Sequence, residues 1–303
     1  MRIGIFGPGA IGGLFAALLR SNELYIFARG ATEDELKSGL IMHTPEGELI
    51  HVLPTEYKLS CNPGELDVAL ICGKSSSTSE LADMVKEYLS DEGIALSVQN
   101  GLGHSEVLAA RLGWQRVLSA STIHASTRLG LNEVQWTGRG EVSIGGLHSE
   151  SPRLADPRVS SLLRCFKEAQ LEPVWCDDIE QGLWIKLLLN IAINPLAAIS
   201  GQENGEILRS ESLLEQAIAI MDEGRKVAIA EGITIESEEM IARLLQVLES
   251  TANNRCSMLQ DIMAGRRTEI DSLCGEVVRR AEKHGIPTPL NLQLMSLVSA
   301  IER

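Results

Sequence analysis

The stretch 2-RIGIFGPGAIGGLFAALLR-20 decides the fold of this chain. An apolar, strand-like run ends at 7-GPGAIG-12, and an apolar helical pattern follows directly. In this position the first glycine permits a tight turn, the second lets a pyrophosphate approach the backbone, and the third lets the helix pack on the sheet. We therefore predict a dinucleotide-binding loop with the phosphates at the helix N-terminus; the alternative is an ordinary glycine-rich turn. The loop residues are Gly7, Pro8, Gly9, Ala10, Ile11 and Gly12.

The first half of the chain continues this alternation of strands and helices. Helical patterns over 78–90 and 104–113 alternate with apolar runs typical of strands. The further strand candidates are 24–28, 67–72, 94–99 and 117–125. Such alternation predicts a mostly parallel sheet covered by helices on both faces. We expect a glycine-turned hairpin over 131–146 near the sheet edge, and a helix over 156–170 with a strand over 171–176 to complete this part.

The strand signal stops near Asp178, and the remainder of the chain has a helical pattern punctuated by glycines. The expected helices cover 179–200, 206–231, 236–264, 268–284 and 290–302. The chain is thus predicted to form an α/β Rossmann-type doubly wound domain over 1–177, followed by an all-α domain over 178–303. A cleft between two such domains is a favoured ligand site. We expect the long amphipathic helices 206–231 and 236–264 to offer a homodimer surface.

Composition excludes several classes of function. The net charge of the 303 residues is −14, and no run of Lys and Arg forms the basic face that a nucleic-acid binder needs. The chain enters a strand at once and has no apolar segment that we expect to span a bilayer, so we predict neither a leader nor a membrane partner. Six scattered cysteines, without a CxxC pair or a Cys/His cluster, indicate a reducing compartment, the cytoplasm, and no metal site.

The type of nucleotide is predicted from the end of the second strand. NAD sites typically carry Asp or Glu there, which accepts a hydrogen bond from the ribose 2′-hydroxyl. Here the strand is followed by Arg29, whose guanidinium suits a 2′-phosphate, so we predict NADPH; a solvated surface arginine is the alternative. Lys74 and Asn100 follow later strands at the same edge of the sheet, where they either contact the cofactor or belong to ordinary turns.

A second stretch, 184-WIKLLLNIAINPLAAI-199, combines an apolar helix with a polar stripe. Lys186, Asn190 and Asn194 are spaced by four residues, so they share one helical face. Because burial of an unpaired ammonium is costly, this lysine either finds partners or loses its proton. One interpretation is a lysine that reaches solvent beside two core asparagines; we favour a stripe that faces the cleft and meets the substrate. Pro195 predicts a kink or break in this helix.

The chain resembles the ketopantoate reductase family over essentially its whole length. The segments that carry this resemblance are 7-GPGAIG-12, 99-QNGLG-103, 184-WIKLLLNIAINPLAA-198, 204-NGEI-207 and 257-SMLQDIMAGRRTEID-271. The last segment is the most specific of them. The resemblance implies an oxidoreductase that reduces the 2-oxo acid ketopantoate to pantoate with NADPH, in pantothenate and coenzyme A biosynthesis.

The resemblance also implies roles for single residues. Lys186 matches a lysine that donates a proton to the ketone oxygen, which suits general acid catalysis of hydride transfer. Ser257 matches a serine that binds the substrate carboxylate, and Glu269 matches a glutamate at the end shared by substrate and cofactor. The other substrate-side positions are Asn190, Asn194, Asn204 and Asn254. The other cofactor positions are Arg29, Lys74, Asn100 and, less closely matched, Ser126.

The chain departs from the family pattern at a few positions, and other functions compete. Ser77 stands where Gln or Asp is expected, Cys256 stands where a second serine is usual, and Pro8 removes one N–H from the loop. A β-hydroxyacid dehydrogenase also places glycine, lysine and asparagine as in Gly182, Lys186 and Asn190. A catalytically silent NADPH-binding regulator is the non-enzymatic alternative, although such a protein is expected to lose the lysine or the serine.

Overall fold

The computed structural model describes residues 1–302, which form two compact units. We call the first, residues 1–99 with 104–179, the α/β unit, and the second, residues 100–103 with Glu180 onward, the helical unit. The short loop 100–103 thus belongs to the helical unit, although it directly follows a strand region of the first. The predicted fold class, a doubly wound α/β part followed by an all-α part, is confirmed.

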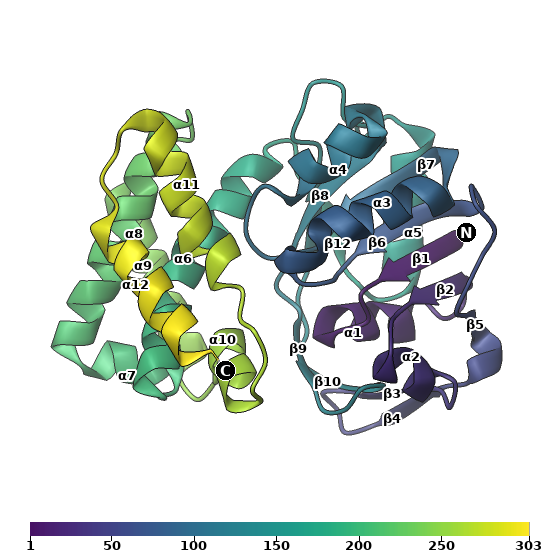
Figure 1. The fold of residues 1–303 in the computed structure, drawn as a ribbon, viewed down its shortest axis with the longest axis horizontal. Helices are drawn as coiled ribbons and strands as arrows, with labels where there is room; N and C mark the ends of the chain where they lie inside the picture. The colour runs from purple at the N-terminus through teal and green to yellow at the C-terminus, as the bar shows by residue number, and fades with distance from the viewer. Residues whose placement is uncertain (303) are drawn as a thin grey trace. The chain divides into compact units, whose positions relative to one another are not determined.

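The α/β unit is built on an eight-stranded sheet (Figure 1). From β5 through β2, β1, β6 and β7 to β8 the strands are parallel, and β11 pairs antiparallel with β8 at the far side. The order reverses at β1, with β2 on one side and β6 on the other, which is the switch point where doubly wound sheets bind ligands. The strands in spatial order are β12 (Pro173–Trp175), β11 (Val142–Gly145), β8 (Val117–Thr122), β7 (Leu89–Ser97), β6 (Leu66–Ile71), β1 (Arg2–Phe6), β2 (Glu23–Phe27) and β5 (Tyr57–Lys58).

Apolar side chains alternate along these strands, so each face of the sheet has its own core. Ile3 and Ile5 of β1 pack in the cluster that includes α1 (Ala10–Leu18) and α5 (Pro157–Glu168). Phe6 lies in the cluster of the opposite face, with α3 (Thr78–Tyr88) and α4 (His104–Leu112). The period of two in a strand produces this division, and it explains why the strands are apolar at nearly every position.

A smaller four-stranded sheet corrects the prediction of a hairpin over 131–146. Its order is β4 (Leu49–Val52), β3 (Leu40–His43), β10 (Glu133–Gly138) and β9 (Ala125–Arg128), and Val134 of β10 packs against Gly13 of α1. The residues expected to form the second arm of the hairpin form β11, which pairs with β8 in the large sheet. The prediction was wrong because the partners of β10 lie far away in sequence, and it also missed β3, β4 and α2 (Ala31–Leu36).

The helical unit contains more breaks than the sequence pattern suggested. The expected helix 206–231 is divided at Ser210, whose side chain caps the start of α8, and the expected helix 236–264 is divided by residues 251–256. Gly224 lets α8 approach α6 closely, because an added Cβ would lie 2.7 Å from Leu188 and Ile191 side-chain atoms. The helices are α6 (Ile179–Ser200), α7 (Asn204–Arg209), α8 (Glu211–Ala230), α9 (Ser237–Ser250), α10 (Ser257–Met263), α11 (Cys274–His284, preceded by a 3₁₀ turn, Ile270–Ser272) and α12 (Pro289–Ile301).

Helix α6 corrects two further predictions. It runs without a break through Pro195, so the proline does not end it. It has 22 residues and contains an apolar window of 18 residues with a mean hydropathy of 1.6. By length and composition alone it could therefore cross a membrane, contrary to the expectation from the sequence. Of that apolar window, 61% is buried within the structure, as in the core helix of a folded domain.

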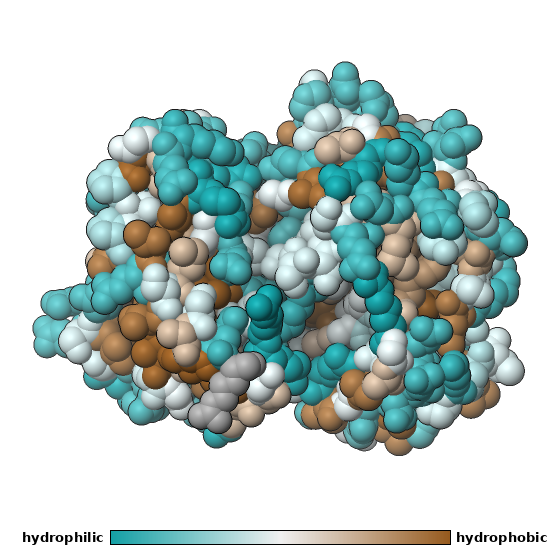
Figure 2. All heavy atoms as spheres, in the orientation of Figure 1, coloured by the Kyte–Doolittle hydropathy of each residue, from teal (hydrophilic) through white to brown (hydrophobic). Residues whose placement is uncertain are grey.

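Figure 2 shows apolar side chains on the face of the helical unit that carries α12. Leu292, Leu297 and Ile301 of that helix are exposed. The homodimer surface expected on the helices of residues 206–231 and 236–264 stays a prediction.

Candidate active site

The glycine-rich loop has the space and geometry that a pyrophosphate requires. Gly7 has φ +89°, and an added Cβ would lie 2.5 Å from the Gly73 Cα, so only glycine fits this turn. A Cβ on Gly12 would lie 2.3 Å from the Gly7 carbonyl oxygen, whereas one on Gly9 would meet nothing within 4 Å. The loop is therefore tightly packed at both ends and open at its middle, beside the first N–H groups of α1. These groups lack partners inside the helix and suit an anion, so the residues present fit a dinucleotide.

The ends of three neighbouring strands meet at this loop. The Gly7 N–H donates to the Phe27 carbonyl of β2 at 3.3 Å, and the Gly73 N–H donates to the Phe6 carbonyl of β1 at 3.0 Å. Arg29 follows β2 and is exposed, while Lys74 follows β6 and is half-buried. The structure thus brings Arg29 and Lys74, the two cationic side chains predicted to contact the cofactor, to the same edge of the sheet as the glycine loop.

Two further polar side chains hold this edge in place. Ser126 of β9 donates from Oγ to the Ala10 carbonyl at 2.9 Å, which fixes the first turn of α1. The buried Gln99 donates from Nε2 to the Gly73 carbonyl at 2.7 Å and to the Thr78 hydroxyl at 2.9 Å. Gln99 belongs to the motif 99-QNGLG-103 but is not among the predicted site residues. Its contacts with Gly73 and Thr78 show that it supports the segment after β6.

The helical unit contains a polar pocket that gathers five of the predicted residues. The pocket encloses about 240 Å³, including the part that is open to solvent. Asn190 and Asn194 come from α6, Ser257 begins α10, and Asn100 and Glu269 come from loops. The remaining lining residues are Met258, Asp261 and Leu273. The two asparagines line one pocket because their spacing of four residues places them on one face of α6.

Lys186 begins the same stripe one turn earlier and is electrostatically perturbed. Burial lowers the pKa of its ammonium to about 8, and the negative charge of Glu269 opposes this shift in part. An ordinary lysine has a pKa near 10.4, so the side chain can exchange its proton much closer to neutral pH. Although Lys186 is not among the residues that line the pocket, it interacts with a carboxylate that does. This combination is typical of a group that transfers a proton.

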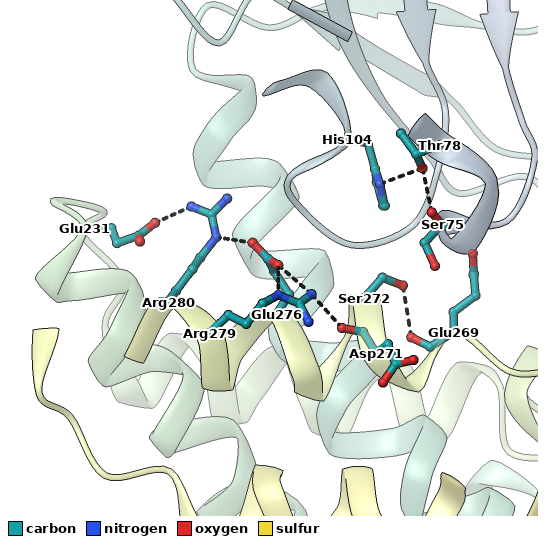
Figure 3. A network of polar contacts seen from close by, with 10 residues as sticks. All are labelled: Ser75, Thr78, His104, Glu231, Glu269, Asp271, Ser272, Glu276, Arg279 and Arg280. Carbon is teal, nitrogen blue, oxygen red and sulfur yellow. Dashed lines mark hydrogen bonds and ion pairs between the residues drawn. The ribbon is translucent and has the colours of Figure 1, made fainter. Parts of the chain in front are cut away.

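Glu269 is positioned from two directions. Its Oε2 accepts a hydrogen bond from Asn100 Nδ2 at 3.3 Å. Its carbonyl accepts a hydrogen bond from the Ser272 hydroxyl at 3.0 Å, which Figure 3 shows. Gly101 brings the Asn100 loop close to this turn: it has φ +94°, and a Cβ would lie 2.4 Å from the Ser272 carbonyl oxygen. The close approach of Gly101 to Ser272 thus places Asn100 beside Glu269.

Gly101→Ala is expected to displace this loop and to lower both stability and catalytic efficiency. A positive φ with a close backbone contact typically costs about 1–3 kcal/mol. Gly232→Ala is the matched control, because Gly232 has φ +89° in the helical unit but an added Cβ meets nothing within 4 Å. Thermal unfolding and steady-state kinetics check this prediction. Equal losses of kcat/KM in the two variants would show that the Gly101–Ser272 approach does not position Asn100.

Cys256, which stands where a second serine is expected, connects two helices. Its thiol caps α10 by accepting from the Leu259 N–H at 3.4 Å, and it donates to the Asn194 carbonyl at 3.6 Å. Burial raises the pKa of the Cys256 thiol, so it keeps the proton that this second bond needs. Cys256 thus connects α6 to the start of α10, beside Ser257.

Asp261 is a pocket residue that the sequence analysis missed. It is almost fully buried, one turn after Ser257 on α10, and its Oδ1 accepts from Arg266 Nε at 2.8 Å. The spacing of four residues between Ser257 and Asp261 was available in the quoted motif. With Glu269, it makes the pocket rich in acceptors, which suits a substrate that carries a hydroxyl group.

Asn204 and Asn254 do not line this pocket. The Asn204 N–H donates to the Asn254 carbonyl at 3.0 Å, and Asn204 Nδ2 donates to the Thr251 hydroxyl at 3.0 Å. Asn204 is buried and its Oδ1 has no hydrogen-bond partner, whereas Asn254 is exposed. The structure thus groups these two residues with each other at the start of α7, and their predicted substrate contacts stay predictions.

An ion-pair network supports the segment that carries Glu269 (Figure 3). Arg280 of α11 pairs with Glu231 at the end of α8 and with Glu276 of its own helix, and Arg279 donates from Nη2 to the Asp271 carbonyl at 2.9 Å. Arg280, Glu231 and Glu276 are each less than 15% exposed, so water screens these pairs little. The network anchors α11 and the 3₁₀ turn after Glu269. Among residues 1–302, no three His, Cys, Asp or Glu side chains gather as a metal site would require.

Two family models match the chain. The model described as "Ketopantoate reductase PanE/ApbA" matches residues 3–149, and the model described as "Ketopantoate reductase PanE/ApbA C terminal" matches residues 178–302. Together they cover most of the α/β unit and nearly all of the helical unit.

Known proteins resemble the chain over its full length. A 2-dehydropantoate 2-reductase of Halobacterium salinarum is 32% identical over 310 residues, which cover 100% of this chain and 99% of that protein. The crystal structure of a ketopantoate reductase family protein from Ralstonia eutropha has a TM-score of 0.87 and 30% identity, and covers 100% of this chain and 98% of that one. A structure of D-mandelate dehydrogenase with NADH and anilino(oxo)acetate has a TM-score of 0.91 at 24% identity, covers 100% of this chain and 98% of that one, and shows the shared fold alone.

Proposed function

The chain belongs to the ketopantoate reductase family, and from this premise we propose that it reduces ketopantoate to pantoate with NADPH, in pantothenate biosynthesis. The observation that carries the proposal is the polar pocket of the helical unit, where Asn190, Asn194 and Ser257 surround an acceptor-rich space beside Glu269. Lys186, with its pKa lowered to about 8 by burial, completes this group of side chains.

Lys186 donates the proton that ketone reduction requires. When NADPH is bound it supplies the hydride, and negative charge then develops on the ketone oxygen of the substrate. A proton donor whose pKa lies near the working pH is the most effective, and the lowered pKa of Lys186 meets this condition. Glu269 raises that pKa in part, so it keeps the ammonium charged at neutral pH.

The pocket residues hold and orient the rest of the substrate. Asn190 and Asn194 donate to the 2-oxo acid group from one face of α6, and Ser257, at the start of α10, donates to its carboxylate. Glu269 accepts a hydrogen bond from the substrate hydroxyl, and Asn100 holds the Glu269 carboxylate through its Nδ2 group. A 2-oxo acid without a hydroxyl would lack this hydrogen bond to Glu269.

The α/β unit holds the cofactor. The free N–H groups at the start of α1 bind the pyrophosphate next to Gly9, and Ser126 keeps this turn in place through the Ala10 carbonyl. Arg29 binds the 2′-phosphate, because a guanidinium matches its charge and geometry. Lys74 adds a second positive charge at the same edge of the sheet.

The pH dependence of turnover follows from the state of Lys186. A general acid must be protonated, and its pKa in the free protein is lowered to about 8. We therefore expect kcat/KM to be level below about pH 7.5 and to fall about tenfold per pH unit above pH 8.5. Initial rates of NADPH oxidation from pH 6 to 10 check this. If kcat/KM fell only above pH 10, the proton donor would be an ordinary, solvated lysine.

The substrate is tested with NADPH oxidation on a panel of 2-oxo acids. The sharpest comparison sets ketopantoate against 3,3-dimethyl-2-oxobutanoate, which has hydrogen in place of the hydroxyl. A hydrogen bond to a charged acceptor is worth about 1.5–3 kcal/mol, so we expect ketopantoate to be preferred at least about tenfold in kcat/KM. Equal rates, or faster oxidation of 3-hydroxyisobutyrate with NADP⁺, would support a different dehydrogenase. Binding of NADPH without turnover of any acid would support a regulator.

A further inference from the structure

Arg29 is already engaged by a carboxylate of a neighbouring helix. Its Nη1 forms an ion pair with Glu80 Oε1, and its Nη2 lies 3.3 Å from Met84 Sδ. Both partners belong to α3, and Glu80 lies in the first turn of that helix. The Arg29 and Glu80 side chains are 55% and 59% exposed, so both reach a ligand at the surface of the α/β unit.

Glu80 shares the edge of the sheet to which the cofactor residues belong. α3 follows β6 by way of Lys74, and β6 and β2 flank β1, the strand that carries the glycine loop. A negative charge in the first turn of a helix interacts favourably with the helix dipole. A fixed negative charge therefore stands beside the guanidinium that recognises the nucleotide.

We propose that Glu80 determines how strongly the protein discriminates between NADPH and NADH. The inference rests on the proposed function, because it takes Arg29 as the residue that meets the ribose 2′ position. A dinucleotide site that prefers NADH usually has an acidic residue at the end of its second strand. This chain lacks that residue in β2 and supplies an equivalent acceptor from α3.

The two nucleotides meet Glu80 in opposite ways. Its carboxylate accepts a hydrogen bond from the 2′-hydroxyl of NADH, which carries no charge at this position. The 2′-phosphate of NADPH is a dianion, so Glu80 repels it and also competes with it for the Arg29 guanidinium. Glu80 thus lowers the preference for NADPH below the level that Arg29 alone would give.

A second acidic side chain nearby must be distinguished from Glu80. Glu33 lies in the first turn of α2, which follows Arg29 directly in the chain. The ion-pair partner of Arg29 is Glu80 and not Glu33. Glu33→Gln is therefore expected to change the preference less than Glu80→Gln.

The test compares NADPH and NADH binding to the full-length protein by calorimetry. Glu80→Gln removes the charge and keeps the side-chain length, so we expect NADPH to bind about five- to tenfold more tightly and NADH to bind more weakly. Asp83→Asn is the matched control, because Asp83 lies on the same helix as Glu80 and its carboxylate forms an ion pair with Arg111 of α4. It is expected to leave the NADPH-to-NADH ratio unchanged.

The outcomes separate this inference from the proposed function. A ratio that is unchanged or lower in Glu80→Gln, or that shifts equally in Asp83→Asn, would overturn the inference while the proposed function stands. If the NADPH-to-NADH ratio shifts in Glu80→Gln but the protein does not reduce ketopantoate, the inference is supported and the proposed substrate is wrong. Failure of the unsubstituted protein to bind either nucleotide would overturn both.

Discussion

Replacing Lys186 with alanine is expected to lower kcat by about 10²–10⁴-fold, the usual contribution of a general acid. NADPH binding is expected to stay nearly unchanged, because the glycine loop, Arg29 and Lys74 lie in the α/β unit and Lys186 does not. The fall of kcat/KM above about pH 8 should disappear as well, since the group that titrates there is removed. Stopped-flow NADPH oxidation and a fluorescence titration of NADPH measure the two quantities separately.

Two controls make this result interpretable. Lys186→Met keeps most of the length of the aliphatic side chain, so a loss of kcat shared by both variants cannot come from lost packing alone. Lys226→Ala removes an exposed lysine that pairs with Asp222 on α8 of the same unit, and it is expected to keep full activity. If Lys186→Ala lost cofactor binding and thermal stability as much as turnover, the lysine would be structural.

Arg29→Ala is expected to weaken NADPH binding about 10- to 100-fold while NADH binding changes little. A hydrogen bond to a charged group contributes about 1.5–3 kcal/mol, and only NADPH carries a phosphate at the ribose 2′ position. Kd values for both nucleotides check the prediction. Arg139→Ala is the matched control, because Arg139 forms an exposed bidentate pair with Glu46 in the same unit. An unchanged preference would mean that the 2′-phosphate binds elsewhere.

Local sequence patterns predicted the part of the fold that carries the glycine loop. The run that begins at Arg2 and the glycines of 7-GPGAIG-12 act over a few residues, so their meaning does not depend on distant partners. The observed β1 and α1 have nearly the predicted bounds, and α6 has the bounds expected for it. Fold class followed from the alternation of such segments.

Long-range pairing could not be predicted in the same way. Gly138 and Gly140 suggested a hairpin, but β10 pairs with β3 and β9, and β11 pairs with β8 in another sheet. A local turn signal carries no information on such distant partners. The division of the helix expected over 206–231 was different, because Ser210 provides a capping signal that was present in the sequence.

The site was predicted best where one helix determines it. Spacing by four residues placed Asn190 and Asn194 on one face of α6, and both line the pocket. Asp261 was missed because its role depends on how α10 packs against the rest of the helical unit. Arg29 and Glu80 are 51 residues apart in the sequence, so no local motif predicts their ion pair.

The central claim is that the Lys186 ammonium protonates the ketone oxygen. A crystal structure with NADP⁺ and the 2-hydroxy acid product bound tests it directly, through the distance from Lys186 Nζ to the oxygen on C2 of the product. We predict a hydrogen bond of about 2.6–3.2 Å. A different side chain or a water molecule within that distance, with Nζ directed away from the product, would contradict the mechanism.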